Sequence, residues 1–324
     1  MSSIAVIIPC FKVKKHILNV VHRIGPEVSA IYVVDDDCPE KSGNFVESHC
    51  TDPRIRILYH CENKGVGGAT KTGFHQALQD GHEIMIKVDG DGQMDPKLIP
   101  RFIRPIKEGY ADYTKGNRFF SIESVGEMPR VRIIGNAILS FLTKVTSGYW
   151  NLMDPANGYL AIHRCVLAIL PLKKIEDRYF FETDMLFRLN TFRAVIYEVP
   201  MDSVYANEKS NLSILKVVME FPRKHLVRFF KRIYYNYFLR DFNMCSVELI
   251  AGLISLLFGV VFGSIHWYFS ITQNIPATTG TVMVAALPII LGFQLLLAAV
   301  HYDVTNIPEK PIHPFFDFEN DDDN

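Results

Sequence analysis

Residues 249–302 contain no Lys, Arg, Asp or Glu, and this stretch constrains the possible folds more than any other part of the sequence. It divides into 249–271 and 281–302, with the polar, proline-containing segment 273–276 between them. Crossing a hydrocarbon core of about 30 Å takes about 20 helical residues, so each half is long enough. Aromatic residues, which favour the membrane–water interface, lie near the ends of the two halves: Trp267, Tyr268 and Tyr302. The stretch predicts a transmembrane helical hairpin; the alternative is a buried helical hairpin of a soluble domain.

The segment before this stretch is strongly basic. Between residues 213 and 240 it has one Glu and seven cations, namely Lys216, Arg223, Lys224, Arg228, Lys231, Arg232 and Arg240. Apolar and aromatic residues alternate with these cations, a mixture typical of helices that lie on an anionic membrane surface. A nucleic-acid-binding helix has a similar composition, but the adjoining hairpin favours a juxtamembrane helix, and we expect no nucleic-acid partner. By the positive-inside tendency, the N-terminal domain lies in the cytoplasm, and two crossings return residues 303–324 to the same side.

Four short apolar runs organise the N-terminal part of the chain. They are residues 4–8, 30–34, 55–59 and 84–88, each bounded by polar turns and separated from the next by a segment long enough for a helix. This alternation predicts an α/β domain in which helices cover both faces of a mostly parallel sheet.

Polar or glycine-rich residues follow each of the four runs. Ligands of parallel sheets bind at the carboxyl ends of the strands, which meet at one edge. The residues predicted at that edge are Pro9-Cys10-Phe11, Asp35-Asp36-Asp37, Asn63-Lys64-Gly65 and Asp89-Gly90-Asp91. Four such ends converging at one edge predict a nucleotide-type pocket.

The last of these segments predicts a divalent metal site. Asp89 and Asp91 are separated by a single residue directly after a buried strand, and Gln93 supplies a third side-chain oxygen. The intervening Gly90 and Gly92 allow the backbone to approach a ligand closely. Because these ligands are hard oxygens, the pattern favours Mg²⁺ or Mn²⁺ over zinc.

The glycine-rich segment 65–73 is similar to two phosphate-binding motifs but matches neither. A P-loop has Gly immediately before its Lys, and a dinucleotide motif has a third Gly; Thr70 occupies both places. We expect a loop leading into a helix over 69–78, with Lys71 in its first turn facing the pocket. A solvent-exposed Lys71 is the alternative.

Several observations bear on the cellular compartment. No signal peptide is recognisable before the first apolar run, because Ser2-Ser3 leads directly into it. The six cysteines contain no Cys-x-x-Cys pair, so reduced cytosolic thiols are expected rather than a zinc or redox site. The acidic end, 319–324, is expected to be disordered and solvated.

Together these motifs resemble family 2 glycosyltransferases of GT-A fold, in the membrane branch that includes dolichol-phosphate mannose synthase and bacterial polyprenyl-phosphate glucosyltransferases. The matching segments are Ile7-Ile8-Pro9-Cys10-Phe11, Asn63-Lys64-Gly65 with Gly68-Ala69, Asp89-Gly90-Asp91-Gly92-Gln93 with Asp95-Pro96, Gly116-Asn117-Arg118 and Asp154-Pro155-Ala156-Asn157-Gly158-Tyr159. The resemblance implies a Rossmann-like, mostly parallel sheet with helices on both faces, then amphipathic juxtamembrane helices and a two-helix transmembrane hairpin.

The chain also departs from the family pattern. Asp35-Asp36-Asp37-Cys38 matches the acidic turn only in part, and Lys12-Val13 replaces an Asn-Glu pair that follows the opening aromatic residue. The second departure puts contacts to the nucleobase near the first loop in doubt. A Gln-x-x-Arg-Trp element of processive polysaccharide synthases is absent, because the only tryptophans are Trp150 and Trp267. This absence favours transfer of a single sugar.

The resemblance implies a metal-dependent, inverting transferase that moves one sugar from a UDP- or GDP-sugar to polyprenyl phosphate, such as undecaprenyl or dolichyl phosphate. The residues expected to bind the donor are Pro9, Phe11, Asp36, Lys71, Asp89 and Lys209. Those expected to bind the acceptor phosphate are Arg118, Arg130, Arg132 and Asn136. A phosphate acceptor is already an anion near neutral pH, so cations that position it matter more than a base.

An acidic pair further along the chain leaves a second acceptor class open. A saccharide or glycolipid headgroup acceptor would need a carboxylate base, for which Asp184 and Asp154 are the candidates. Glu182-Thr183-Asp184 is similar to the acidic pair of many soluble relatives, although on the helix expected over 180–189 these residues would equally serve as helix-capping, solvated acids. The full set of catalytic candidates is Asp89, Asp91, Arg118, Arg132, Asp154, Glu182 and Asp184. A membrane scaffold with a vestigial nucleotide domain is the non-enzyme alternative.

These interpretations predict four parts of the chain. They are a cytoplasmic catalytic domain (1–210), basic juxtamembrane helices (211–245), a transmembrane hairpin (246–302) and a cytoplasmic acidic tail (303–324). We expect an integral membrane protein with its catalytic domain on the cytoplasmic face, of a bacterial inner membrane rather than the endoplasmic reticulum. Formation of a homo-oligomer is a further possibility.

Overall fold

The computed structural model describes residues 3–120, 130–202 and 214–316, with only the backbone described at 130–132 and 214–219. The chain forms two compact units, residues 1–229 together with 308–324, and residues 230–307. Two sequence predictions lie outside the described residues, namely the donor contact of Lys209 and the disordered acidic end.

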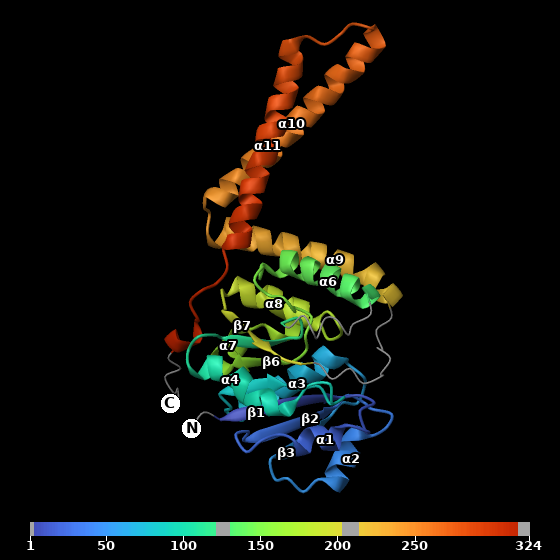
Figure 1. Ribbon diagram of the computed structural model, residues 1–324, viewed down its shortest axis with the longest axis vertical. Helices are drawn as coiled ribbons and strands as arrows, with labels where there is room; N and C mark the ends of the chain where they lie inside the picture. The colour runs from blue at the N-terminus through green and yellow to red at the C-terminus, as the bar shows by residue number, and fades with distance from the viewer. Residues whose placement is uncertain (1–2, 121–129, 203–213, 317–324) are drawn as a thin grey trace. The chain divides into compact units, whose positions relative to one another are not determined.

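A seven-stranded sheet forms the centre of the first unit (Figure 1). Its strands are β1 (Ile4–Cys10), β2 (Ala30–Asp35), β3 (Ile55–Tyr59), β4 (Ile84–Lys87), β5 (Tyr113–Asn117), β6 (Leu160–His163) and β7 (Ile196–Pro200). Their order across the sheet is β3-β2-β1-β4-β6-β5-β7, and only β6 runs antiparallel to its neighbours. The prediction of a mostly parallel α/β sheet is confirmed.

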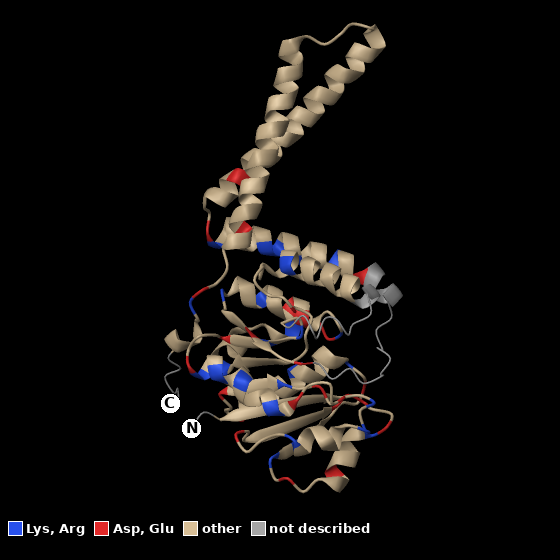
Figure 2. Ribbon diagram, in the orientation of Figure 1, with Lys and Arg blue, Asp and Glu red and all other residues tan. Residues whose placement is uncertain are grey.

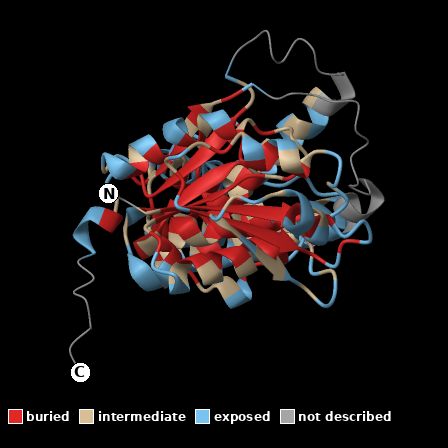
Figure 3. Ribbon diagram, turned by 90° about the horizontal axis from the view of Figure 1, so that it is seen from below, coloured by how far each residue is buried: buried red, intermediate tan, exposed pale blue. Residues whose placement is uncertain are grey.

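Helices cover both faces of this sheet, as the apolar runs predicted. The described helices of the unit are α1 (Ile17–His22), α2 (Ser42–His49), α3 (Val66–Gln79), α4 (Ile99–Lys107), α6 (Arg130–Ser147), α7 (Arg164–Ile169), α8 (Phe181–Thr191) and the first part of α9 (Ile214–Tyr234). The helices expected over 69–78 and 180–189 correspond to α3 and α8. Side chains alternate between the two faces of each strand, so the sheet separates two apolar cores. One contains residues of α1, α2 and α4, and the other residues of α3, α7 and α8. Figure 3 shows the buried strands between helices whose outer surfaces are exposed.

The antiparallel direction of β6 determines which loops lie at the same edge of the sheet. Because β6 is antiparallel to both β4 and β5, β5 points in the same direction as β4. The carboxyl ends of β1, β2, β4 and β5 therefore lie along one edge of the sheet. This arrangement brings the residues after Asn117 to the same edge as the Asp89–Asp91 motif.

The second unit contains two long apolar helices, α10 (Met244–Gln273) and α11 (Thr279–Thr305). Their most apolar windows have mean hydropathies of 2.3 and 2.4, which in length and composition suits a membrane crossing. Figure 2 shows no Lys or Arg on either helix. Small residues let the two backbones approach closely: a Cβ at Gly292 would lie 2.7 Å from the Leu256 backbone nitrogen and 2.8 Å from the Gly252 carbonyl oxygen.

A buried ion pair joins the end of α9 to the end of α11 within this unit. The Arg232 guanidinium, only 1% exposed, donates to both carboxylate oxygens of Asp303 at 2.5 and 3.0 Å. The Tyr237 hydroxyl, in the π-helical turn Tyr235–Arg240, donates to the same carboxylate at 2.6 Å. Arg232 was one of the cations that we expected on the membrane surface; this one is instead inside the protein.

After α11 the chain returns to the first unit. The buried carboxylate of Asp112 accepts the backbone N–H groups of Ile312 and His313 at 2.9 and 2.8 Å, and its Oδ1 lies 2.8 Å from the His313 Nδ1 atom. The His313 ring packs on the His163 ring with a centroid separation of 4.4 Å. Residues 308–316 are therefore attached to the same unit as the sheet.

Candidate active site

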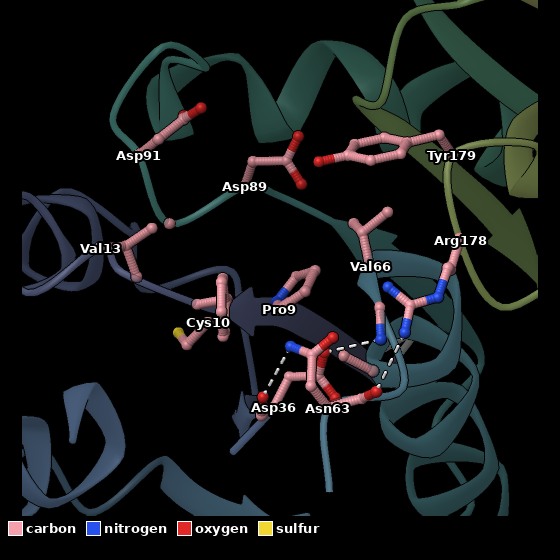
Figure 4. Close-up of a pocket in the computed structure, with 14 residues that line it drawn as sticks. Pro9, Cys10, Val13, Asp36, Asn63, Val66, Asp89, Asp91, Arg178 and Tyr179 are labelled. Atoms are coloured by element: carbon pink, nitrogen blue, oxygen red, sulfur yellow. Dashed lines mark hydrogen bonds between the residues drawn. The ribbon is translucent and has the colours of Figure 1, made fainter. Parts of the chain in front are cut away.

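A cavity of about 300 Å³, here called cavity A, opens at the carboxyl edge of the sheet. It is lined by Pro9, Cys10, Phe11, Val13, Asp36, Asn63, Gly65, Val66, Ala69, Asp89, Gly90, Asp91, Arg178 and Tyr179. Figure 4 shows that these side chains come from the ends of several strands and from the loop before α8. Four of the six residues expected to bind the donor, Pro9, Phe11, Asp36 and Asp89, line this cavity.

Asp36 shapes the wall of cavity A through bonds inside the protein. Its buried carboxylate accepts the backbone N–H groups of Lys64 and Gly65 at 2.9 and 2.7 Å and lies 2.6 Å from the His60 Nδ1 atom. The Asn63 amide donates to the Asp36 carbonyl oxygen at 3.0 Å. These bonds fix the turn before α3, so the geometry assigns Asp36 to positioning that turn.

A second cavity of about 370 Å³, here called cavity B, adjoins the first. Val66, Asp89, Asp91 and Tyr179 line both cavities. The other lining residues of cavity B are Lys87, Gln93, Met94, Arg118, Leu139, Ala156, Asn157, Gly158, Glu182, Met201 and Phe221. The two carboxylates of the predicted metal motif therefore lie at the boundary between the cavities, beside Arg118 and Glu182.

Two buried lysines lie on β4 and β5, the two strands that flank β6, and the first of them lines cavity B. The Lys87 ammonium, on β4 and 1% exposed, donates to Asp89 Oδ1 at 2.6 Å and to the Gly158 carbonyl at 3.1 Å, and lies 3.8 Å from Glu182. The Lys115 ammonium, on β5, donates to the Asn157 carbonyl. Burial lowers the pKa of Lys115 to about 8, while the negative charges of Glu182 and Asp154 oppose that shift.

Glu182 lies among these lysines. Burial raises the pKa of the Glu182 carboxyl, and the charges of Lys87 and Lys115 act in the opposite direction. Asp184, two residues further along α8, lines neither cavity. Its fully buried carboxylate accepts the Arg228 Nε–H at 2.6 Å and the Glu176 backbone N–H at 3.0 Å. The structure thus separates the acidic pair, with Glu182 at the cavity and Asp184 at the contact between α8 and α9.

Arg118 and Asp154 form a bidentate ion pair at cavity B. The guanidinium donates from Nε and Nη2 to the two carboxylate oxygens at 2.7 and 2.9 Å. Asp154 is 1% exposed and Arg118 is 21% exposed. Asp154 is therefore the partner that orients the Arg118 side chain.

The remaining predicted residues lie in three different places. Lys71 donates to the Ile175 carbonyl oxygen and lies beside the Asp177 carboxylate, each at 2.6 Å, so it holds the loop before α8 and lines neither cavity. Arg130 and Arg132 lie in the first turn of α6, and their side chains are outside the described part of the structure. Asn136, one turn further along α6, is half-buried and lines neither cavity.

The residues at the cavity boundary fit a divalent cation. Two carboxylates and the nearby Gln93 amide supply the hard oxygen ligands that Mg²⁺ and Mn²⁺ prefer. Across the described residues, no group of three or more His, Cys, Asp or Glu side chains gathers at metal-binding spacing. The protein would therefore supply only part of the coordination, and phosphate oxygens and water the rest, as is usual for Mg²⁺.

Sequence reasoning missed three polar residues that line these cavities, namely Lys87, Arg178 and Tyr179. Lys87 carried a signal, because it is the only charge inside the apolar run 84–88, and a buried strand lysine must find a partner. Arg178 and Tyr179 carried none, because their neighbours along the chain do not indicate which loop faces the cavity.

The sequence matches a known family over the segment that supplies most of the residues lining both cavities. Residues 5–169, just over half of the 324-residue chain, match the sequence model of Glycosyl transferase family 2. The chain belongs to glycosyltransferase family 2. This match confirms the resemblance and the prediction of an enzyme of this class.

Two similar proteins of this family act on polyprenyl phosphates according to their names. UDP-N-acetylglucosamine–dolichyl-phosphate N-acetylglucosaminyltransferase of Methanococcus voltae is 30% identical over 216 residues, which are 62% of this chain and 86% of that protein. Undecaprenyl-phosphate mannosyltransferase of Micrococcus luteus is 30% identical over 178 residues, which are 54% of this chain and 72% of that protein. This family 2 glycosyltransferase is thus related to polyprenyl-phosphate sugar transferases.

A solved structure supports the fold. Glucosyl-3-phosphoglycerate synthase from Mycobacterium tuberculosis, crystallised with Mn²⁺, UDP-glucose and phosphoglyceric acid, superposes with a TM-score of 0.50 at 18% identity. The superposition covers 71% of this chain and 79% of that one. The predicted GT-A type of fold is confirmed.

Proposed function

We propose that this family 2 glycosyltransferase transfers one sugar from a nucleotide-sugar to a polyprenyl phosphate and inverts the anomeric carbon. One observation carries the proposal: Asp89 and Asp91 lie at the boundary of two cavities, one built from strand ends and the other containing Arg118. A transferase needs this arrangement, because the acceptor oxygen must reach the anomeric carbon of the donor, which is bonded to the leaving diphosphate.

Cavity A is the proposed donor site. The turn held by Asp36 and the amino end of α3 form one wall, and Phe11 and Tyr179 supply aromatic surface for a nucleoside or sugar ring. A UDP- or GDP-linked donor fits this description. The crystallisation of the structural neighbour with UDP-glucose and Mn²⁺ is consistent with it.

Asp89, Asp91 and Gln93 are the proposed ligands of Mg²⁺ or Mn²⁺. A divalent cation bound there would neutralise negative charge on the departing nucleoside diphosphate. The Lys87 ammonium donates a hydrogen bond of 2.6 Å to Asp89 Oδ1, which fixes the direction of that carboxylate.

Cavity B is the proposed acceptor site. Arg118 supplies a guanidinium suited to gripping a phosphate, and Asp154 orients it. Leu139, Met94, Met201 and Phe221 give the same cavity apolar surface, which suits the first isoprene units beside the phosphate. Arg130, Arg132 and Asn136 remain proposed acceptor ligands on α6.

The proposed reaction is a single displacement. A lipid phosphate oxygen, already anionic, forms the new bond to the anomeric carbon, while the bond to the diphosphate breaks and its electron pair leaves with the nucleotide. One displacement inverts the configuration. No side chain needs to remove a proton, so the residues of the two cavities act by binding and orienting the reactants.

The proposed location is the cytoplasmic face of a bacterial inner membrane, with residues 1–210 as the catalytic domain and 246–302 as the membrane hairpin. Two observations support the membrane hairpin and its orientation, namely the apolar lengths of α10 and α11 and the excess of cations before them. Nucleotide-sugars and polyprenyl phosphates are the proposed partners, with homo-oligomers as a further proposal.

The test uses purified full-length protein in detergent with Mn²⁺ or Mg²⁺. Radiolabelled UDP-N-acetylglucosamine, UDP-glucose and GDP-mannose are each incubated with undecaprenyl or dolichyl phosphate, and the lipid is extracted. We expect label in the lipid with one donor, and none when excess chelator is present. Label that never enters lipid phosphate with any donor would refute the proposed acceptor.

A saccharide acceptor is the second candidate, and the position of Glu182 is the observation that favours it. Its carboxyl lies at cavity B, and burial raises its pKa, which makes the carboxylate a stronger base. Under this alternative, Glu182→Gln would remove nearly all turnover, whereas lipid phosphate as acceptor predicts a modest loss. Asp184→Asn is the less useful test, because Asp184 forms a buried ion pair with Arg228. Removing the carboxylate charge would leave the Arg228 charge without that partner and would destabilise the fold.

A further inference from the structure

Helix α9 directs two of its cations into the first unit rather than toward solvent. Lys224 Nζ lies 2.8 Å from the Glu176 carboxylate, and Arg228 Nη2 lies 3.3 Å from it. Arg228 also donates from Nε to the buried Asp184 at 2.6 Å. The Lys224 and Arg228 side chains are 31% and 15% exposed, so these contacts are partly shielded from solvent.

Glu176 belongs to a loop that packs tightly on the amino end of α3. This loop, residues 175–179, is held by Lys71, which binds the Ile175 carbonyl oxygen and the Asp177 carboxylate. The Gly68 N–H donates to the Asp177 carbonyl oxygen at 2.9 Å. A Cβ at Gly67 would lie 2.7 Å from the Glu176 carbonyl oxygen, so no larger residue fits there without movement of the loop.

The same loop forms a wall of cavity A. Arg178 donates to the Asn63 carbonyl oxygen at 3.4 Å, across the turn that Asp36 holds. Tyr179 lines both cavities, and Figure 4 shows its ring extending toward Asp89. The positions of Arg178 and Tyr179 in the cavity therefore depend on where the 175–179 loop is held.

We propose that α9 is a positioning element of the donor site, acting through Lys224 and Arg228 on Glu176 and thereby on the 175–179 loop. Glu176, Lys224 and Arg228 are positioning residues that touch no substrate. The inference rests on the assignment of cavity A to the donor. It makes donor binding depend on a helix whose composition alone indicated only attachment to a membrane.

The geometry favours this role over a purely electrostatic attraction to lipid. Lys224 and Arg228 already have carboxylate partners within the first unit, which removes much of their attraction for an anionic surface. The neighbouring Arg223 is exposed and has no ion pair among those that the described side chains form, so it is the matched control. Arg223→Gln makes the same change in charge on the same helix turn.

The test compares Glu176→Gln, Lys224→Gln and Arg223→Gln in the full-length protein. Affinities for UDP–Mn²⁺ and GDP–Mn²⁺ are measured by calorimetry, and KM is measured separately for donor and lipid phosphate. We expect Glu176→Gln and Lys224→Gln to weaken nucleotide binding and raise the donor KM by about two- to tenfold, the range for one or two partly shielded ion pairs. The lipid phosphate KM and resistance to carbonate extraction should stay at wild-type values.

Two further variants separate positioning from a general loss of stability. Lys224→Arg keeps the charge and should retain the wild-type donor KM. Lys224→Glu places two carboxylates together and should raise the donor KM more than Lys224→Gln, and adding Glu176→Gln should relieve that repulsion. A loss of global stability would instead lower kcat and the kcat/KM values for donor and lipid phosphate together. The Glu176→Gln, Lys224→Glu double variant would then not recover these values.

Hydrogen–deuterium exchange provides a readout without any ligand. Exchange at residues 175–180 should quicken in Glu176→Gln and Lys224→Gln, and should match wild type in Arg223→Gln. If wild-type protein binds neither nucleotide, the proposed function fails, and exchange alone then decides whether α9 holds the loop. Unchanged exchange in Glu176→Gln, or donor KM values equal to those of Arg223→Gln, would overturn the inference.

Discussion

Replacing Arg118 tests the proposed acceptor site most directly, but the structure shows that the simple variant confounds two effects. Arg118 is the bidentate partner of Asp154, which is 1% exposed. Arg118→Ala leaves that carboxylate buried without its cation, which costs about 3 kcal/mol, the low end for a broken buried pair because Arg118 is partly exposed. For a domain of this size, that loss lowers Tm by about 6–12 °C.

Arg118→Ala should also weaken acceptor binding. Loss of one charge-assisted phosphate contact is worth about 1.5–3 kcal/mol, or roughly ten- to more than a hundredfold in kcat/KM for the lipid phosphate. We expect this loss as a higher acceptor KM, with nucleotide affinity within about twofold of wild type, because Arg118 lines cavity B and not cavity A.

The double variant Arg118→Ala, Asp154→Asn separates the two effects. It removes the buried charge together with its partner, so Tm should recover most of the loss. Acceptor kcat/KM should stay low if Arg118 grips the phosphate. Recovery of both quantities would refute the reasoning, because Arg118 would then serve only to neutralise Asp154. Arg56→Ala, which breaks the more exposed ion pair with Asp80, is the control. It should leave acceptor kinetics unchanged and should lower the free energy of unfolding by no more than about 1 kcal/mol.

Three further outcomes are expected. Asp91→Ala should abolish transfer while leaving the protein folded, and calorimetry should show loss of Mn²⁺-dependent UDP or GDP binding; comparable turnover would remove the metal proposal. Full-length protein should resist carbonate extraction, and its release would contradict two membrane-spanning helices. Burial lowers the pKa of His163 to about 4, whereas the unfolded chain titrates near about 6.5, so the unfolded state binds more protons in this window. The free energy of unfolding should therefore fall by about 2–3 kcal/mol as pH falls from 6.5 to 4. Denaturant titrations at several pH values measure this dependence, which should be weaker in His163→Asn. An unchanged dependence of the free energy of unfolding on pH in that variant would refute the assignment to His163.

The strand ends were predictable from the sequence because strands and turns are local patterns. A short apolar run followed by Asp89-Gly90-Asp91 indicates a strand and its carboxyl end without any knowledge of distant contacts. The convergence of four such ends at one edge then follows from parallel pairing. The sheet confirms this reasoning, and both cavities lie at that edge.

Choices between neighbouring side chains were not predictable. Residues two apart on a helix point in nearly opposite directions, so either Glu182 or Asp184 had to face away from the cavity. The sequence does not say how α8 is rotated; packing of Phe181, Met185 and Leu189 into the core decides it. The contacts of Lys71, an expected donor ligand, were not predictable for a similar reason, because its partners lie more than a hundred residues further along the chain.

The basic segment before the hairpin shows the same limit. Its composition indicated cations facing a membrane, yet Lys224, Arg228 and Arg232 each pair with a carboxylate of the protein. Counting charges cannot separate cations directed at lipid from cations directed inward, because the carboxylate partners are contributed by residues remote in sequence.

The contacts of Asp112 with Ile312 and His313 have a topological consequence. The chain leaves the sheet-containing unit after residue 229 and is attached to that same unit again from residue 308. A polypeptide that starts and finishes on one side of a bilayer must traverse it an even number of times, whatever the lipid. The Asp112 contacts are therefore a parity constraint: any arrangement in which only one of α10 and α11 spans the bilayer would require those hydrogen bonds to break.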